Sequence, residues 1–191
     1  MTAQQAAEKL KEKFGQLISE PQLFRDETTV WLNDAGQIAA VCQYAKTELG
    51  FDYLQDITSV DNHPNTPRWE VVYQLYSLQH HCAIRIKTAV NESISELPTV
   101  TGVWRTANWH EREIFDMMGI RFRDHPDLRR IIMWEGYPYH PLRKDFPLAG
   151  LPTEQPDVAF AEPAPMEGGP FVTNPGVKTA KEREPRAKGE T

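Results

Sequence analysis

The residues that could do chemistry are concentrated between positions 104 and 146. Three histidines, His110, His125 and His140, lie there among carboxylates, which could indicate a metal site or an acid–base site. His110 and Glu113 are three residues apart and could face one metal ion from a helix, but the second histidine of an HExxH motif is missing and no second such pair follows. The alternative is that these histidines are hydrogen-bonded groups of a core or an interface.

The same segment has a dense and nearly balanced set of charges. Between Trp104 and Phe146 there are eight basic and seven acidic residues, interleaved with aromatic residues and prolines. Arginine and aromatic side chains are typical anchors of protein–protein contacts. The other interpretation is an internal ion-pair network that holds this chain's own loop, and both can be true together.

Composition excludes several classes of protein. The chain has 191 residues and a formal net charge of −6, so net charge alone does not favour nucleic acid or anionic lipid as a partner. The longest apolar run is 38–42, far below the roughly 20 residues of a membrane-spanning helix. The start lacks a basic segment typical of a secretory signal, so we expect the protein to stay in the compartment where it is made. With two cysteines, Cys42 and Cys82, expected to be reduced thiols, no four-cysteine cluster site can form.

Hydrophobic spacing predicts the elements that position these residues. Helices are expected at 3–19, 37–49 and 107–118, and strands at 51–60, 69–78 and 83–90, with extended chain at 22–33 and a short strand at 120–123. This order indicates an α+β fold, with helices packed on a small, mostly antiparallel sheet.

The helix at 107–118 has the clearest signals. Asn108 is a suitable N-cap and Glu111 stands in the capping-box position. Arg112 and Asp116 have the i, i+4 spacing of an ion pair on one helix face. Gly119 is expected to end the helix.

Two regions differ sharply in composition. Residues 1–150 have the pattern of one domain, whereas 151–191 contain seven prolines and four glycines. Such a segment cannot bury enough apolar surface to fold alone. We therefore expect an α+β domain at 1–150 and an extended Pro/Gly-rich tail at 151–191 that lies on partner subunits.

Several spaced blocks resemble one family. The run from Glu111 to Met118, followed by His125 and then by Arg129-Arg130-Ile131-Ile132, is similar to the signature of the C-type subunit (the 30 kDa subunit family) of proton-translocating NADH–quinone oxidoreductase, respiratory complex I. The block 140–148 resembles that family's next block. Segments 52–57, 70–73 and 107–109 add to the resemblance, which covers roughly 50–150.

This resemblance implies a role in electron transport without a redox centre in the chain itself. Family members are peripheral-arm subunits that pack chiefly on subunits D and B of the complex. FMN, iron–sulfur clusters and quinone are expected in other subunits, where electrons pass from NADH to quinone and protons are transported. The chain is expected to be a non-catalytic subunit with no catalytic, cofactor-binding or metal residues and no membrane span, peripheral at the cytoplasmic face of the bacterial inner membrane.

The resemblance also implies which residues have partner-contact or structural roles. They are the charged and histidine positions of the two blocks: Glu111, Arg112, Glu113, Asp116, His125, Arg129, Arg130, His140, Arg143, Lys144 and Asp145. The charges of the helix are expected to orient it and to pair with Arg129 or Arg130. Arg143, Lys144 and Asp145 are expected to bind carboxylates and backbone carbonyls, in a partner or in this chain.

Three alternatives remain open at this point. The chain could be the equivalent subunit of a related membrane-bound hydrogenase or of a dehydrogenase complex with another electron donor. It could be a free enzyme in which His125 or His140 works with Asp127 or Asp145 as an acid–base pair. It could also be a soluble adaptor unrelated to respiration.

Overall fold

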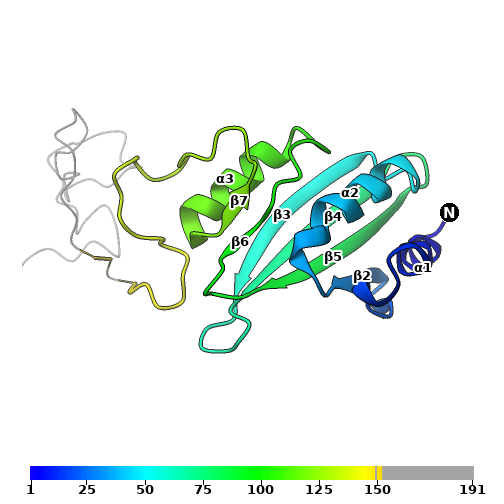
Figure 1. The fold of residues 1–191 in the computed structure, drawn as a ribbon, viewed down its shortest axis with the longest axis horizontal. Helices are drawn as coiled ribbons and strands as arrows, with labels where there is room; N and C mark the ends of the chain where they lie inside the picture. The colour runs from blue at the N-terminus through cyan, green and yellow to red at the C-terminus, as the bar shows by residue number, and fades with distance from the viewer. Residues whose placement is uncertain (149, 152–191) are drawn as a thin grey trace, which may run out of the picture. The chain divides into compact units, whose positions relative to one another are not determined.

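The structure, a computed structural model, describes residues 1–148 and 150–151. Apart from Leu151, the predicted tail at 151–191 lies outside the described residues, so the proposed division into domain and tail stays a prediction. Within the described part, the helices and strands form the predicted α+β arrangement, in which helices pack on a mostly antiparallel sheet (Figure 1).

Five strands form the main sheet in the order β1-β2-β5-β4-β3. The strands are β1 (Gln22–Phe24), β2 (Glu27–Leu32), β3 (Tyr53–Asp61), β4 (Trp69–Ser77) and β5 (Cys82–Val90). All neighbours are antiparallel except β2 and β5, which pair in parallel. The extended chain predicted at 22–33 is a hairpin, because Arg25 and Asp26 turn it with φ values of 50° and 64°.

Side-chain alternation along these strands separates a core face from a polar face. Val71, Tyr73 and Leu75 of β4 are fully buried, whereas Glu70 is partly exposed and pairs with Lys87 of β5. Alternate residues of a strand point to opposite faces, so one face of the sheet is covered. The buried side chains of α1 and α2 join these strand residues in one hydrophobic core.

Three α-helices accompany the sheet: α1 (Ala3–Phe14), α2 (Ile38–Thr47) and α3 (Ala107–Met118). Helix α1 is shorter than the predicted 3–19, because Gly15 takes a φ of 58° and a 3₁₀ turn, Gly15–Leu17, follows. A second 3₁₀ turn, Ala35–Gln37, precedes α2. None of the described helices combines the length and apolar character needed to cross a bilayer.

A second, two-stranded sheet positions α3. Strand β6 (Glu96–Pro98) pairs in parallel with β7 (Arg121–Arg123), and α3 connects them. The short strand at β7 matches the prediction, whereas β6 was not foreseen. Strand β6 comes before α3 in the chain and β7 comes directly after it. The pairing of these two strands therefore holds both ends of α3 in place beside β3 (Figure 1).

Two predictions about α3 are wrong, although its bounds are those expected. Thr106 holds the N-cap position without a side-chain hydrogen bond, so Asn108 is not the cap and no capping box forms. Among the described residues, Arg112 and Asp116 do not pair with each other, because each holds a different part of a later segment. Cys42 and Cys82 are free cysteines; Cys42 is buried, whereas Cys82 is partly exposed.

Candidate functional site

The segment 125–148, which contains most of the predicted signature residues, has little regular structure and is held by side chains. We call it the anchored segment. Its described part contains no helix or strand, yet several of its backbone groups bond to buried charged residues of α3 and β3. Three buried carboxylates, Asp116, Asp61 and Glu111, organise this region.

Asp116 of α3 is the first of these carboxylates and is fully buried. Its Oδ2 atom accepts hydrogen bonds from the backbone N–H groups of Ile131 (3.1 Å), Ile132 (2.7 Å) and Met133 (2.9 Å). Its Oδ1 atom accepts from Arg130 Nη1 at 2.7 Å. Burial alone would raise the pKa of Asp116, but these hydrogen bonds lower it, so the charged form is favoured.

Arginine and histidine side chains complete this anchor. Arg130 Nη1 also donates to the carbonyl of Tyr139 at 3.1 Å, and His140 Nδ1 lies 2.9 Å from the carbonyl of Asp116. A carbonyl can only accept, so Nδ1 of His140 carries the proton. Burial, together with nearby Arg143 and Arg130, lowers the pKa of His140. The predicted pairing of Asp116 with Arg130 is confirmed.

The second carboxylate, Asp61 at the end of β3, is paired with Arg68. Arg68 donates to Asp61 through Nε and Nη2, both at 2.9 Å, and to Asp145 through Nη2 at 2.8 Å. Glu92 accepts from Nη1 at 2.5 Å, and the backbone N–H of Lys144 donates to Asp61 at 2.8 Å. This cluster joins the loop between β3 and β4 to the anchored segment.

The charge of Asp61 is strongly favoured in this setting. Burial raises its pKa, but the hydrogen bonds from Arg68, Lys144 and His63 outweigh burial and lower the pKa to about 2. The Arg68 guanidinium lies over the Trp69 ring at 4.4 Å, and that of Arg143 lies 5.2 Å from the same ring. Such stacking of guanidinium on indole adds cation–π attraction to the ion pairs.

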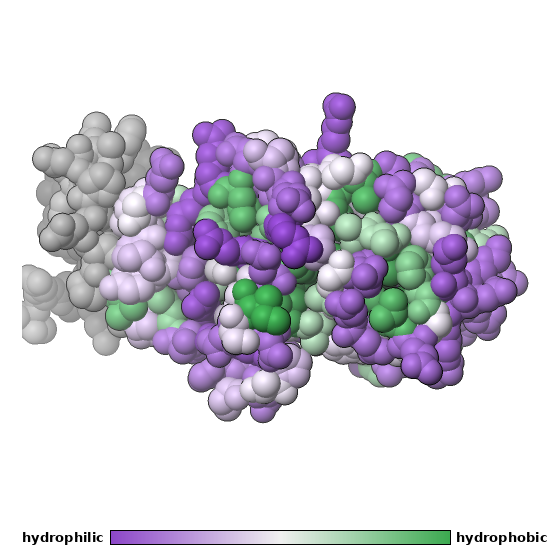
Figure 2. Space-filling view, in the orientation of Figure 1, coloured by the Kyte–Doolittle hydropathy of each residue, from purple (hydrophilic) through white to green (hydrophobic). Residues whose placement is uncertain are grey.

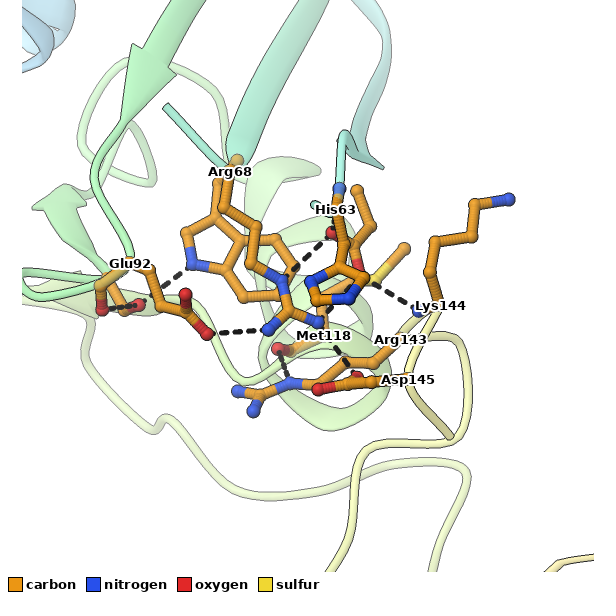
Figure 3. Close-up of polar contacts among 10 residues, drawn as sticks. His63, Arg68, Glu92, Met118, Arg143, Lys144 and Asp145 are labelled. Carbon is orange, nitrogen blue, oxygen red and sulfur yellow. Dashed lines mark hydrogen bonds and ion pairs between the residues drawn. The ribbon is translucent and has the colours of Figure 1, made fainter. Parts of the chain in front are cut away.

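Gly119 allows the anchored segment to approach the end of α3. It has a φ of 80°, and Arg143 Nε donates to the carbonyl of the preceding Met118 at 2.7 Å (Figure 3). A Cβ atom at position 119 would lie 2.3 Å from Arg143 Nη2 and 2.6 Å from His140 Nε2. The glycine is therefore required both by backbone conformation and by the close contact.

Replacing Gly119 by alanine is expected to destabilise the chain by about 1–3 kcal/mol, since the new methyl group must displace Arg143 and His140. Urea unfolding of the full-length chain measures this effect. Gly102→Ala is the matched control, because nothing lies within 4 Å of a Cβ there and its φ is not positive. Equal stability of the two variants would contradict this packing.

The third carboxylate, Glu111, lies in the core instead of capping its helix. Its Oε1 accepts from the backbone N–H of Val100 at 2.7 Å and its Oε2 from the hydroxyl of Thr99 at 2.5 Å. Burial outweighs these hydrogen bonds and raises the pKa of Glu111 to about 7. Tyr73 Oη, which is also buried, has no hydrogen-bond partner among the described residues.

His125 stands beside Glu111 in a neutral form. Its Nδ1 accepts from the backbone N–H of Asp127 at 3.0 Å, so Nε2 carries the proton and donates to the carbonyl of Asn108 at 3.3 Å. Burial is the main cause that lowers the pKa of His125. The separation of Nε2 from Glu111 Oε2 is 3.9 Å, which is longer than a hydrogen bond.

Glu111 is expected to make the stability of the chain depend on pH. Its pKa is raised from 4.5 in the unfolded chain to about 7, so the folded state binds the proton more tightly. The stability that this tighter proton binding adds to the folded state is fully present below pH 4.5. It is lost as the pH rises toward 7, and the loss amounts to up to about 3 kcal/mol. Glu111→Gln removes it, so the variant should gain stability relative to wild type between pH 5 and about 7.

Thermal unfolding of both full-length proteins across this pH range tests the expectation. Glu113→Gln is the control, because Glu113 is the exposed neighbour on the same helix. Parallel curves of stability against pH for wild type and Glu111→Gln would show that Glu111 titrates normally.

The predicted site residues thus divide into two groups. The members of the first group contact other parts of this chain: Glu111, Arg112, Asp116, His125, Arg130, His140, Arg143, Asp145 and the backbone of Lys144. Glu113 and the Lys144 side chain are exposed, and Arg129 is an exposed residue that pairs with Asp127. Their predicted contacts with a partner stay predictions.

The histidines are not gathered into one site. His110 Nδ1 lies 3.2 Å from Asp56 Oδ1 of β3, whereas His125 contacts the carbonyl of Asn108 and His140 that of Asp116. Among residues 1–148 and 150–151, no group of three histidine, cysteine or carboxylate side chains could hold a metal ion. In the same residues, neither His125 nor His140 bonds to the side chain of Asp127 or Asp145.

Sequence reasoning missed the Arg68 cluster and the Thr99–Glu111 contact. Asp61 and Arg68 flank the proline-rich loop between two strands. Opposite charges at the two ends of such a loop are a signal that could have suggested an ion pair between them. Nothing in the sequence around Thr99 indicates that a glutamate eleven or twelve residues later would be buried against it.

The outer surface of this region combines apolar and charged side chains. Trp109 of α3 is 62% exposed, Ile132 57% and Leu142 56%. In the space-filling view, apolar patches lie directly beside strongly hydrophilic ones in the region of α3 (Figure 2). Exposed aromatic and aliphatic residues on a fixed backbone are suited to contact with another protein.

Comparison with known proteins finds relatives among the subunits of NADH-quinone oxidoreductases. Residues 32–152 match the family described as respiratory-chain NADH dehydrogenase, 30 kDa subunit. The chain is 53% identical over 137 residues to a C-type NADH-quinone oxidoreductase subunit, the second of that type, of Rhizobium meliloti (strain 1021), covering 64% of this chain and 75% of that protein. It is 48% identical over 148 residues to the C-type subunit of the same enzyme of Geotalea uraniireducens (strain Rf4), covering 78% and 89%.

Solved structures agree with these relatives. The trypsin-resistant fragment of Nqo5 is 29% identical, with a TM-score of 0.55, and the match covers 65% of this chain and 97% of the fragment. A chain of the membrane-bound sulfane sulfur reductase, an archaeal respiratory membrane complex, has a TM-score of 0.65 at 21% identity over 75% of this chain and 85% of its own. This second likeness concerns the fold alone.

Proposed function

Because this chain belongs to the family of the respiratory-chain NADH dehydrogenase 30 kDa subunit, we propose that it is a peripheral, non-catalytic subunit of an NADH–quinone oxidoreductase. In this proposal it holds no cofactor and scaffolds the module that passes electrons through iron–sulfur clusters to quinone. Its partners are subunits D and B of the same complex. Its place is the cytoplasmic face of the bacterial inner membrane, without a membrane span of its own.

The family match supports the place in this enzyme, and the observation that supports a scaffolding role is the use of buried charge to fix the anchored segment. Asp116 alone binds three consecutive backbone N–H groups and Arg130, and Asp61 binds the backbone of Lys144. These carboxylates are therefore engaged in holding the chain. A segment fixed in this way can present Ile132 and Leu142, next to Trp109 of α3, to a neighbour without the entropy cost of ordering a loop.

Purification of the complex through a tag on this chain tests the proposal. After mild detergent extraction of membranes, subunits D and B should co-purify with the chain, and cross-linking should join them to residues of the anchored segment. The NADH-oxidising subunits should be present in the same preparation. Recovery with hydrogenase-type subunits in their place would favour the equivalent subunit of a related complex.

The chain purified by itself tests the cofactor part of the proposal. Its metal content and its absorbance in the flavin region should both be at background. A stoichiometric metal ion or flavin in this preparation would contradict the proposed role.

A further inference from the structure

Arg112 of α3 is a buried arginine without a carboxylate partner in the described part of the chain. Only 7% of the residue is exposed. Its Nε donates to the carbonyl of Arg129 at 3.0 Å and its Nη2 to that of Arg130 at 3.4 Å. Throughout residues 1–148 and 150–151, no carboxylate oxygen comes within 4.0 Å of its nitrogens, and Nη1 makes no hydrogen bond. A buried charge without an opposite charge is costly to the folded state.

Two other arginines with little exposure have carboxylate partners in this chain. Arg68, whose side chain is 5% exposed, contacts Asp61, Glu92 and Asp145. Arg130, whose side chain is 12% exposed, contacts Asp116 at 2.7 Å. Arg143, which is partly buried, resembles Arg112 instead, because its Nε donates to the carbonyl of Met118 and, among the described residues, no carboxylate lies within 4.0 Å of it. Of these two arginines, Arg112 is the one that lines the groove described next.

The Arg112 side chain lines an open groove of about 390 Å³. The other lining residues are Trp109, Arg129, Arg130, Ile131 and Glu135. Arg129 and Arg130 are already paired with Asp127 and Asp116, and Glu135 supplies a negative charge to the lining without contacting Arg112 within 4.0 Å. The formal charges at the groove therefore balance, but among the described residues Arg112 is the lining arginine with no carboxylate within 4.0 Å.

Apolar surface borders this groove and gives it the character of a contact site. The guanidinium of Arg112 lies 5.1 Å from the centroid of the Trp109 ring, which is 62% exposed. Ile131 lines the groove, and the adjoining Ile132 is 57% exposed. An aspartate or glutamate entering here would place its carboxylate on Arg112 and its methylene groups against the indole and isoleucine.

We propose that this groove binds an aspartate or glutamate side chain of a neighbouring subunit, and that Arg112 forms the buried ion pair that completes the interface. The inference rests on the proposed function, because the neighbour is a subunit of the same complex. Charge complementarity favours a carboxylate, since guanidinium pairs with carboxylate through two parallel N–H···O bonds. Removing one member of such a pair weakens association strongly, because the other charge is left buried.

The test compares Arg112→Met with wild type in two preparations. In the purified full-length chain, the melting temperature should change by no more than about 2 °C, because loss of two carbonyl contacts is offset by removal of an unpaired buried charge. In membranes, recovery of the partner subunits with the tagged chain should fall about thirtyfold or more. Arg130→Met is the matched control. It should lower the melting temperature of the isolated chain, because it leaves the buried Asp116 carboxylate without its arginine partner.

A photo-crosslinking phenylalanine derivative in place of Trp109 identifies the occupant. The expected product joins position 109 to a segment of another subunit that contains an aspartate or glutamate. A product with residues 152–191 of this chain, or with a second copy of it, would overturn the inference.

The outcomes also separate this inference from the proposed function. If wild type co-purifies normally and Arg112→Met does so equally well, the inference alone fails. If Arg112→Met unfolds as readily as Arg130→Met, the role of Arg112 is internal and the inference also fails. If wild type does not co-purify with such a complex, the proposed function fails and the inference falls with it.

Discussion

Asp116→Ala is expected to lower the free energy of unfolding by about 3–5 kcal/mol. The change removes the acceptor of three backbone N–H groups, at Ile131, Ile132 and Met133, and leaves Arg130 without its carboxylate in a buried position. Unsatisfied buried donors add to the cost of the stranded charge. Urea unfolding of the full-length chain, followed by tryptophan fluorescence, measures the loss.

The matched control for this change is Asp127→Ala. Asp127 also pairs with an arginine, Arg129, but both side chains are more than half exposed, so its loss should cost less than about 1 kcal/mol. Hydrogen exchange should show faster exchange at 131–133 in Asp116→Ala. If Asp116→Ala were as stable as Asp127→Ala, the anchored segment would not depend on this carboxylate.

Arg68→Ala is the second change with a large expected effect, again about 3–5 kcal/mol. Asp61 is completely buried at its side chain and would keep only the backbone N–H groups of His63 and Lys144. Arg85→Ala is the control, because Arg85 forms a partly exposed pair with Glu27. A loss below about 1 kcal/mol for Arg68→Ala would contradict the central place of this residue in the cluster.

The same change should alter stability at acid pH. In wild type, the lowered pKa of Asp61 contributes stability that is present above its ordinary pKa of 3.8 and is lost as the pH falls toward about 2. Without Arg68, burial is opposed by fewer hydrogen bonds, so the pKa of Asp61 should rise. The difference in stability between wild type and Arg68→Ala should therefore shrink as the pH falls below 4.

Local patterns were sufficient to predict most, but not all, of the elements of this fold. The alternation of Val71, Tyr73 and Leu75 locates β4, and the apolar stripe of α3 with Gly119 after it gives that helix its observed bounds. These signals work because each element buries one face, so apolar residues recur at a regular spacing along the local sequence. Strand β6 has three residues and pairs only with distant β7, so no local period reveals it.

The candidate site could be located from the sequence but not resolved into contacts. The charged block at 104–146 is the right region, and its interpretation as an internal network is correct for Asp116 with Arg130 and for Asp145 with Arg68. Helical spacing suggested that Asp116 pairs with Arg112, but backbone N–H groups fifteen to seventeen residues later compete successfully for its oxygens. Such long-range partners depend on tertiary structure, which spacing does not encode.

In our proposal this chain is a structural subunit whose anchored segment is needed for electron transfer elsewhere in the complex. NADH oxidation by membranes, in a strain whose only NADH dehydrogenase is this complex, tests that role most directly. Deleting the chain should abolish NADH–quinone oxidoreductase activity, and wild type, but not Asp116→Ala, should restore it. Full NADH oxidation by membranes that lack the chain would contradict the proposed role.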